Sequence, residues 1–110
     1  MISTPTRAAV VTALLALAGC SGGDTGEPDT AVTRGERTYK HVCLACHAAD
    51  PKQDGSLGPA IAGSSRELIE ARVVRGSYPE GYTPKRNSQA MPKLPHLADA
   101  VDDLTAYLNQ

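Results

Sequence analysis

The sequence predicts an all-α domain, because three stretches repeat apolar residues at helical spacing and no stretch alternates apolar and polar residues as a strand does. Two irregular stretches, residues 48–63 and 77–94, fill the space between the three expected helices. Loops of this length in a small domain usually surround a functional site. We therefore expect three main helices whose long loops wrap around one site.

The first segment of the chain, residues 1–19, has the pattern of a secretory signal peptide. Arg7 is its only charged residue and precedes an apolar run, residues 8–18, that is too short to span a bilayer as a permanent helix. The run ends in Leu-Ala-Gly-Cys at residues 17–20, which resembles the bacterial lipobox, where cleavage leaves a Cys that carries lipid. This predicts lipidation of Cys20 and export to the periplasmic side of a bacterial membrane or to the cell surface. The alternative is ordinary cleavage nearby, which would leave Cys20 as a free or disulfide-bonded thiol.

Residues 20–32 are predicted to form a flexible tether that begins with the lipidated Cys20. After that Cys, the segment is rich in Gly, Asp, Thr and Pro and has almost no apolar residues. The folded domain is expected to cover residues 33–110.

Two capping boxes predict where the first two helices of this domain begin. In such a box, a hydroxyl side chain and a side chain three residues later each bond to the backbone of the other residue. The box at Thr33–Glu36 precedes positions that recur at helical spacing, namely Gly35, Tyr39, Val42, Cys43 and Cys46. The box at Ser64–Glu67 precedes the apolar residues Leu68, Ile69, Ala71, Val73 and Val74. Gly76 is the expected stop of the second helix, because glycine readily adopts the left-handed conformation that ends helices.

The last helix is predicted from one apolar stripe of Leu97, Val101, Leu104 and Leu108. Acidic residues gather near its start, where the helix dipole favours negative charge; they are Asp99, Asp102 and Asp103. Ala98 stands where a Ser or Asp cap is expected, so the sequence leaves the start of this helix open by about one turn.

Composition indicates that the domain needs more than its apolar core to be stable. The chain has 110 residues with no Trp and no Phe, and part of its apolar content lies in the signal segment. A domain of about 80 residues with so small a core usually needs a disulfide, a metal or a cofactor to be stable. From residue 33 onward, ten Lys or Arg nearly balance nine Asp or Glu, so the basic surface typical of nucleic-acid binding is absent from the sequence.

The motif Cys43-Leu44-Ala45-Cys46-His47 is the CxxCH pattern of haem c attachment. Two thiols three positions apart near the end of a helix point to the same side, where each can add to one vinyl group of the porphyrin. The adjacent His47 is then placed to bind the iron. A thioredoxin-like dithiol would need a βαβ setting that the sequence lacks. A zinc site made of Cys43, Cys46, His47 and either His41 or His96 stays open on the count of ligands alone.

With this motif, residues 33–110 resemble the class I c-type cytochromes. Gly35 and Tyr39 look like that family's Gly and aromatic residue on the first helix, and Tyr107 looks like the aromatic residue on the last helix, which packs crosswise against the Gly. Gly58 and Pro59 resemble the Gly-Pro pair whose backbone carbonyl accepts a hydrogen bond from the proximal His, a contact that orients the imidazole ring. The resemblance implies a cytochrome c fold around one covalently attached haem c.

Met91 and Pro92 resemble the family's Met-Pro pair, in which the Met sulfur is the sixth iron ligand. Met1 lies in the segment expected to be removed, so Met91 would be the only thioether in the mature chain. The resemblance thus implies that His47 and Met91 are the axial ligands. His96 and, less strongly, His41 are competing candidates. In the loop after Gly76, Tyr78, Tyr82, Lys85 and Arg86 are candidate hydrogen-bond donors to a haem propionate.

The function implied by the resemblance is single-electron transfer between membrane redox complexes, without enzymatic activity. We expect a monomer that meets protein donors and acceptors and is held at the membrane by its lipid. One alternative is a haem protein that binds gases or reduces peroxide, although no distal acid and base are visible in the sequence. Another alternative is a fixed cytochrome subunit of an oxidase or dehydrogenase complex.

Overall fold

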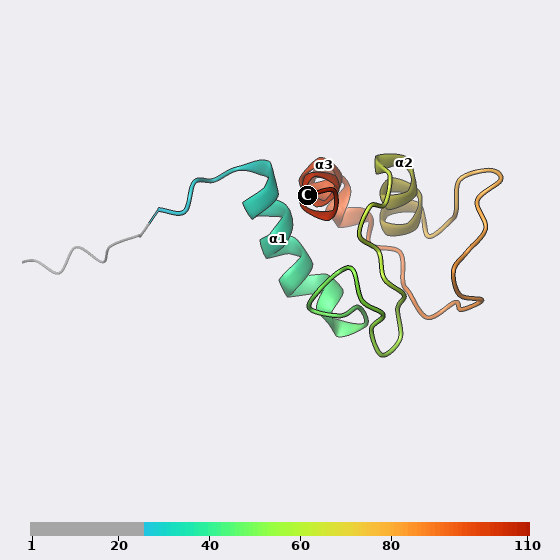
Figure 1. Ribbon diagram of the computed structural model, residues 1–110. Helices are drawn as coiled ribbons and strands as arrows, with labels where there is room; N and C mark the ends of the chain where they lie inside the picture. Colours follow the sequence, from blue (N-terminus) through green and yellow to red (C-terminus); the bar gives the residue numbers. More distant parts are fainter. Residues whose placement is uncertain (1–25) are drawn as a thin grey trace, which may run out of the picture.

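The structure is a computed structural model that describes residues 26–110. Three helices, α1, α2 and α3, are joined by long loops (Figure 1). Within the described residues there is no strand, so the prediction of an all-α domain is confirmed for this part of the chain. The signal segment and Cys20 lie outside the described residues.

Helix α1 spans Ala31–Val42 and starts one turn earlier than the sequence analysis expected. Its capping box joins Thr30 and Thr33, so the prediction that Thr33 is the N-cap was wrong. The Thr33 amide donates to the Thr30 hydroxyl at 3.2 Å, and the Thr30 amide donates to the Thr33 hydroxyl at 2.9 Å. This reciprocal pair satisfies amides that the start of a helix leaves without partners. The sequence offers several hydroxyl residues that could act as the N-cap of this helix, and in the structure the N-cap is Thr30.

Helix α2 spans Arg66–Ile69 and continues as a π-helix over Glu70–Arg75. Its N-cap is Ser65, which accepts a hydrogen bond from the Leu68 amide at 3.1 Å. The expected cap at Ser64 was wrong by one residue, because the Ser64 hydroxyl donates to the Ile61 carbonyl instead. Gly76 ends the π-helix in the left-handed conformation, with φ of 65°, which confirms it as the stop.

Helix α3 spans Val101–Leu108 and is preceded by a 3₁₀ helix over Pro95–Ala100. The predicted apolar stripe is therefore divided between two helices. Leu97 lies on the 3₁₀ helix, and the other members of the stripe, Val101, Leu104 and Leu108, are buried on α3. No side chain caps α3 at Ala100. The 3₁₀ turn brings the chain into the α-helix in place of a side-chain cap.

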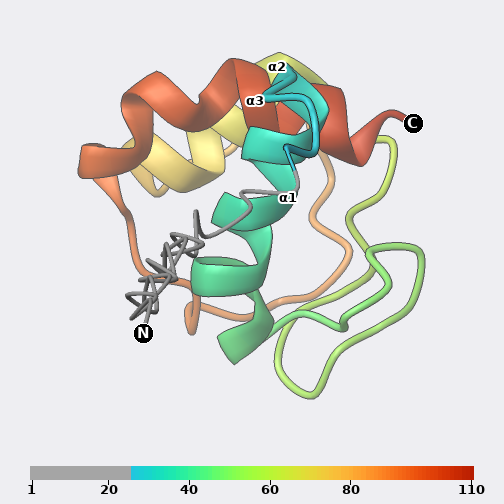
Figure 2. The ribbon, with the colours of Figure 1, turned by 90° about the vertical axis from the view of Figure 1, so that its left-hand side faces the viewer.

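Helices α1 and α3 cross in close contact, and Figure 2 shows α1 running across α3. A methyl group at Gly35 would collide with the Asp103 carbonyl group and would lie 2.9 Å from Cβ of Tyr107. Tyr39, one turn further along α1, is fully buried with its ring centroid 5.4 Å from that of Tyr107. The crosswise contact that the sequence analysis expected is thereby confirmed, and it requires glycine at residue 35.

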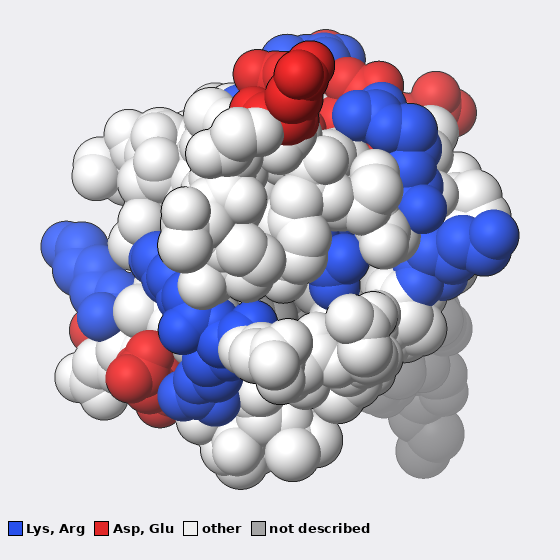
Figure 3. Space-filling view, turned by 90° about the vertical axis from the view of Figure 1, so that its right-hand side faces the viewer, with Lys and Arg blue, Asp and Glu red and all other residues white. Residues whose placement is uncertain are grey.

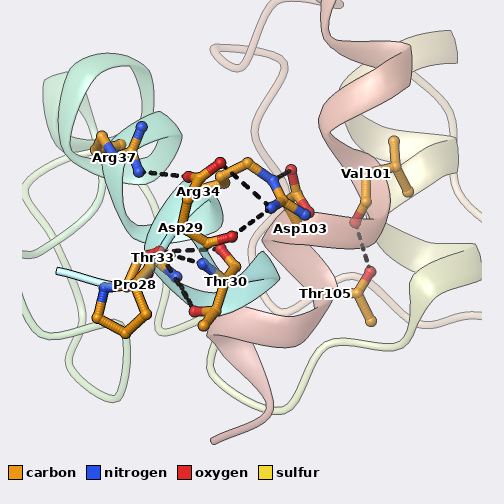
Figure 4. A network of polar contacts seen from close by, with 9 residues as sticks. All are labelled: Pro28, Asp29, Thr30, Thr33, Arg34, Arg37, Val101, Asp103 and Thr105. Atoms are coloured by element: carbon orange, nitrogen blue, oxygen red, sulfur yellow. Dashed lines mark hydrogen bonds and ion pairs between the residues drawn. The ribbon is translucent and has the colours of Figure 1, made fainter. Parts of the chain in front are cut away.

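Arg34, directly before Gly35 on α1, stabilises the same crossing (Figure 4). Its Nε and Nη2 donate to the two carboxylate oxygens of Asp103, each at 2.9 Å. The hydrogen bond from Arg34 lowers the pKa of Asp103, so this carboxylate is ionised at neutral pH. Arg34 also donates to the Asp29 carbonyl at 2.9 Å, and Arg37 binds the Asp29 carboxylate at 2.8 Å. The segment just before α1 is thus bound to α1, and Arg34 joins it in turn to Asp103 of α3.

The hydrophobic core lies between the three helices and is small. Its buried side chains are Tyr39, Ile69, Val73, Val101, Leu104 and Leu108. Met91, Leu94 and Leu97 pack against this cluster from the segment that precedes α3. The core therefore joins the helices to the loop that carries the predicted sixth ligand.

Candidate functional site

The described residues enclose a cavity of about 1000 Å³, counting the open space at its mouth. One wall is apolar and comes from α2, the π-helix and α3, through Leu68, Ile69, Val73, Leu104 and Leu108. The cavity is also lined by five residues that the sequence analysis assigned to one cofactor site, namely Cys43, Cys46, His47, Pro59 and Met91. These residues are far apart in the chain, so the fold brings them together.

The end of α1 directs the CxxCH residues toward this cavity. The helix passes into a 3₁₀ turn over Cys43–Ala45, in which the Cys43 carbonyl accepts from the amides of Cys46 at 3.1 Å and His47 at 2.9 Å. Both cysteines are free thiols. Burial raises the pKa of the Cys43 thiol to about 11, so this side chain is uncharged at neutral pH. A thioether at this position would also be uncharged and would suit the same apolar surroundings.

His47 is held by the loop that follows it. Its Nδ1 lies 2.9 Å from the Pro59 carbonyl oxygen, which can only accept a hydrogen bond, so Nδ1 must carry the proton. In the neutral ring the lone pair is then on Nε2, the atom needed to bind a metal. The contact expected from the Gly-Pro pair is therefore present, and it leaves Nε2 of His47 available to bind a metal.

Gly58 presses against the face of the same imidazole ring. A methyl group at this position would lie 2.5 Å from Nδ1 and 2.9 Å from Nε2 of His47. The Gly58 amide donates to the Cys46 carbonyl at 3.0 Å, which holds the loop against the motif. From the sequence, Gly58 was expected only as part of the Gly-Pro pair that supplies the carbonyl, and this steric requirement was missed. The one feature of the sequence that could have indicated this requirement is that a glycine, Gly58, directly precedes Pro59.

Met91 is half-buried and lines the cavity, whereas the competing histidines do not. His41, near the end of α1, and His96, on the 3₁₀ helix before α3, are both exposed. Among residues 26–110, no group of three or more His, Cys, Asp or Glu side chains could hold a metal ion. The zinc set that the sequence left open is therefore not assembled in the described part of the chain.

Cationic and aromatic side chains from the π-helix and the following loop line the cavity. The Arg72 guanidinium lies 4.4 Å from the centroid of the Tyr78 ring, which stacks on Tyr82 at 5.4 Å. Lys85 donates to the Ala60 carbonyl at 2.7 Å, and Arg86 also lines the cavity. Figure 3 shows the side of the molecule on which this loop lies, with Lys and Arg side chains spread among uncharged atoms and with Asp and Glu at its top and lower left. An apolar wall with cations beside it suits a flat apolar group that carries carboxylates, as haem does.

Arg72 is a lining residue that the sequence analysis missed. It follows Leu68 by four residues and Ile69 by three, so helical spacing alone places it on the same stripe as these two cavity-lining side chains. This spacing was the available signal. The charge of Arg72 caused it to be left out of the apolar pattern.

Comparison with known proteins finds one family. The family model described as Cytochrome C oxidase, cbb3-type, subunit III, matches residues 30–108. No curated protein and no solved structure matches the chain. The matched range includes all three helices and every described residue assigned to the site.

We expect Gly58→Ala to displace the His47 ring, because the added methyl group has no space beside it. The hydrogen bond from Nδ1 to Pro59 should then weaken, and NMR of the ring nitrogens should detect the loss of a single fixed tautomer. Crowding of this kind should lower the free energy of unfolding by about 1–3 kcal/mol.

Gly63→Ala is the matched control for this variant. Gly63 has φ of 80° and no atom near the site of a new methyl group, so this change should cost about 1–2 kcal/mol through backbone strain alone. The His47 tautomer should be unaffected in the control. An unchanged tautomer in Gly58→Ala as well would show that the close contact does not orient the ring.

Proposed function

Because the chain belongs to the family described as cytochrome c oxidase, cbb3-type, subunit III, and is thus a c-type cytochrome, we propose that it carries single electrons on one covalent haem c. The observation that carries this proposal is that Cys43, Cys46, His47 and Met91 all line one cavity. The apolar wall and the cations beside it fit the porphyrin and its two propionates.

The two cysteines are proposed to hold the haem. The thiols of Cys43 and Cys46 would each add across one vinyl double bond of the porphyrin, with a sulfur–carbon bond formed and the thiol hydrogen taken up by the other vinyl carbon. This addition needs no oxidant and releases no leaving group. The 3₁₀ turn supports the proposal because it presents both thiols to the same cavity. Covalent attachment suits an exported protein, which could not easily recover a lost cofactor.

His47 and Met91 are proposed as the axial ligands. The bond from Nδ1 to Pro59 leaves Nε2 of His47 free to bind, and Met91 lines the same cavity from the segment before α3. When bound, the haem supplies an Fe(III)/Fe(II) couple, whose potential a Met ligand raises. With both axial positions taken, no position is left for a substrate, so we propose electron transfer rather than catalysis.

The partners are proposed to be redox proteins, one donor and one acceptor. The family description names an oxidase subunit, and the chemistry at the iron would be the same in a mobile carrier and in a subunit of a complex. The proposed arrangement is a monomer on a tether.

Anchoring by lipid at Cys20 is likewise a proposal and rests on the lipobox-like residues 17–20. None of the helices in residues 26–110 is long and apolar enough to cross a membrane. The proposed lipid would hold the domain on the periplasmic side of a bacterial membrane or at the cell surface.

The central test is the covalent bond. Mass spectrometry of the denatured mature protein should find haem still attached, because two thioethers survive unfolding. Replacing both Cys43 and Cys46 by Ala should remove the haem. Leu44→Ala is the matched control, because Leu44 lies inside the same motif but is exposed and does not line the cavity. Complete extraction of haem from the wild-type protein into acidified organic solvent would refute the proposed function.

The sixth ligand is tested by comparing Met91→Ala with His96→Ala. Oxidised wild type should be low-spin with the weak long-wavelength absorption of a sulfur–iron bond. Met91→Ala should abolish this band, admit carbon monoxide to the reduced iron, and lower the potential by on the order of 0.1 V, within the ~0.8 V that axial ligands span. His96→Ala should change none of these, because His96 is exposed. The opposite pattern would indicate two histidine ligands and a carrier of low potential.

The anchor is tested by Cys20→Ser. This variant should leave the membrane fraction while its absorption spectrum stays that of wild type, because the change lies outside the domain. The amount of protein in the separated membrane and aqueous fractions is measured by Western blot, and the haem spectrum of each fraction is recorded. A variant that stays with the membrane would instead indicate an uncleaved helix or a tightly bound protein partner.

A further inference from the structure

The π-helix at the end of α2 has an unusual pattern of hydrogen bonds at its last turn. The Ala71 carbonyl accepts from the Gly76 amide and also from the Ser77 amide, the latter at 2.9 Å. The left-handed conformation of Gly76 makes this possible, because it turns the chain back toward the helix. The Ser77 amide, which an α-helix would direct to the Val73 carbonyl, is therefore bonded elsewhere.

The Val73 carbonyl has a partner from a distant part of the chain. It accepts a hydrogen bond of 2.6 Å from the Leu94 amide, three residues after Met91. Figure 1 shows how this comes about, since the loop after α2 swings away from the helices and returns to them before α3. The wide helical turn thus leaves a backbone acceptor available where the Met91 segment passes.

A second contact lies beside this hydrogen bond. An ideal Cβ built on Gly76 would be 3.0 Å from Cβ of Lys93, which is closer than side chains normally approach. The segment that follows Met91 therefore packs directly on the glycine that ends the π-helix. Two neighbouring residues, Lys93 and Leu94, are therefore both held at the C-terminal end of the π-helix.

We propose that Gly76 and the Val73 carbonyl are positioning groups for Met91. They fix the backbone two and three residues after the sulfur ligand, at the end of a long loop, and so add to the packing of Met91 and Leu94 against the core. The proposal rests on the proposed function, which takes Met91 as an axial ligand. Gly76 and Val73 act through the backbone of the loop; neither is assigned a contact with the iron.

The test compares two glycines that share a backbone conformation. Gly76 has φ of 65° and Gly81 has φ of 78°, so Ala strains the backbone in a similar way at both positions. Only at Gly76 would the new methyl group meet a neighbour, because there is no atom within 4 Å of the corresponding position at Gly81. Gly81→Ala is therefore the matched control for Gly76→Ala.

In the haem-loaded protein, Gly76→Ala should weaken the long-wavelength sulfur–iron band and speed carbon monoxide binding to the reduced iron. The rate should rise on the order of tenfold, because the population with Met91 off the iron increases. The Leu94 amide should exchange with solvent faster by a similar factor, which NMR can follow without any electron-transfer assay. Gly81→Ala should change each quantity less than about twofold. Adding Lys93→Gly to Gly76→Ala should restore the band, because the methyl group then has space.

Equal effects of the two Ala variants would overturn the proposal, and so would failure of Lys93→Gly to restore the band. If Gly76→Ala does not fold, the Leu94 amide in wild type decides the matter. Slow exchange would support its bond to Val73, and exchange as fast as in the exposed loop would overturn the proposal. Failure of the proposed function is distinguished from these results, because wild type itself would then lack the sulfur–iron band.

Discussion

The close crossing of α1 over α3 at Gly35 is the contact on which the rest of the structure depends. Because residue 35 has no side chain, the two backbones approach until Tyr39 is enclosed beside Tyr107. Tyr39 then donates to the Ala48 carbonyl at 2.6 Å, and burial raises its pKa to about 12, so it remains a donor at all physiological pH values. The crossing is thereby coupled to the residues just after the CxxCH motif. A larger residue at position 35 would separate the helices and shift the motif with them.

The core of the domain and the wall of its cavity are made by the same side chains. Ile69, Val73, Leu104 and Leu108 belong to the buried cluster and also line the cavity. A chain without Phe or Trp has few other ways to bury apolar surface. An apolar group bound in the cavity would extend this core, and any ligand that binds only the folded state adds to its stability. The core is therefore small for the same reason that the cavity is apolar, since one set of side chains forms both.

Backbone carbonyls, more than side chains, position the groups of the site. The Cys43 and Cys46 carbonyls shape the motif and its loop, the Pro59 carbonyl orients His47, and the Val73 carbonyl holds the segment that follows Met91. Long loops can hold a precise site in this way, since each buried or half-buried acceptor needs a partner and specifies where the chain must pass. This explains how a domain with only three short helices can have a defined cavity.

The sequence by itself determined the all-α class, the apolar stripes, the Gly76 stop and the five residues predicted to bind one cofactor, because these depend on local periodicity and on short motifs with their own chemistry. It did not determine the helix starts, since Thr30 and Thr33, or Ser64 and Ser65, can each act as a cap and only the folded chain selects between them. The need for glycine at residue 58, the inward position of Arg72 and the bond from Leu94 to Val73 were decided by the tertiary structure. Each of these arises from groups that are distant in sequence and become neighbours only when the loops close around the cavity.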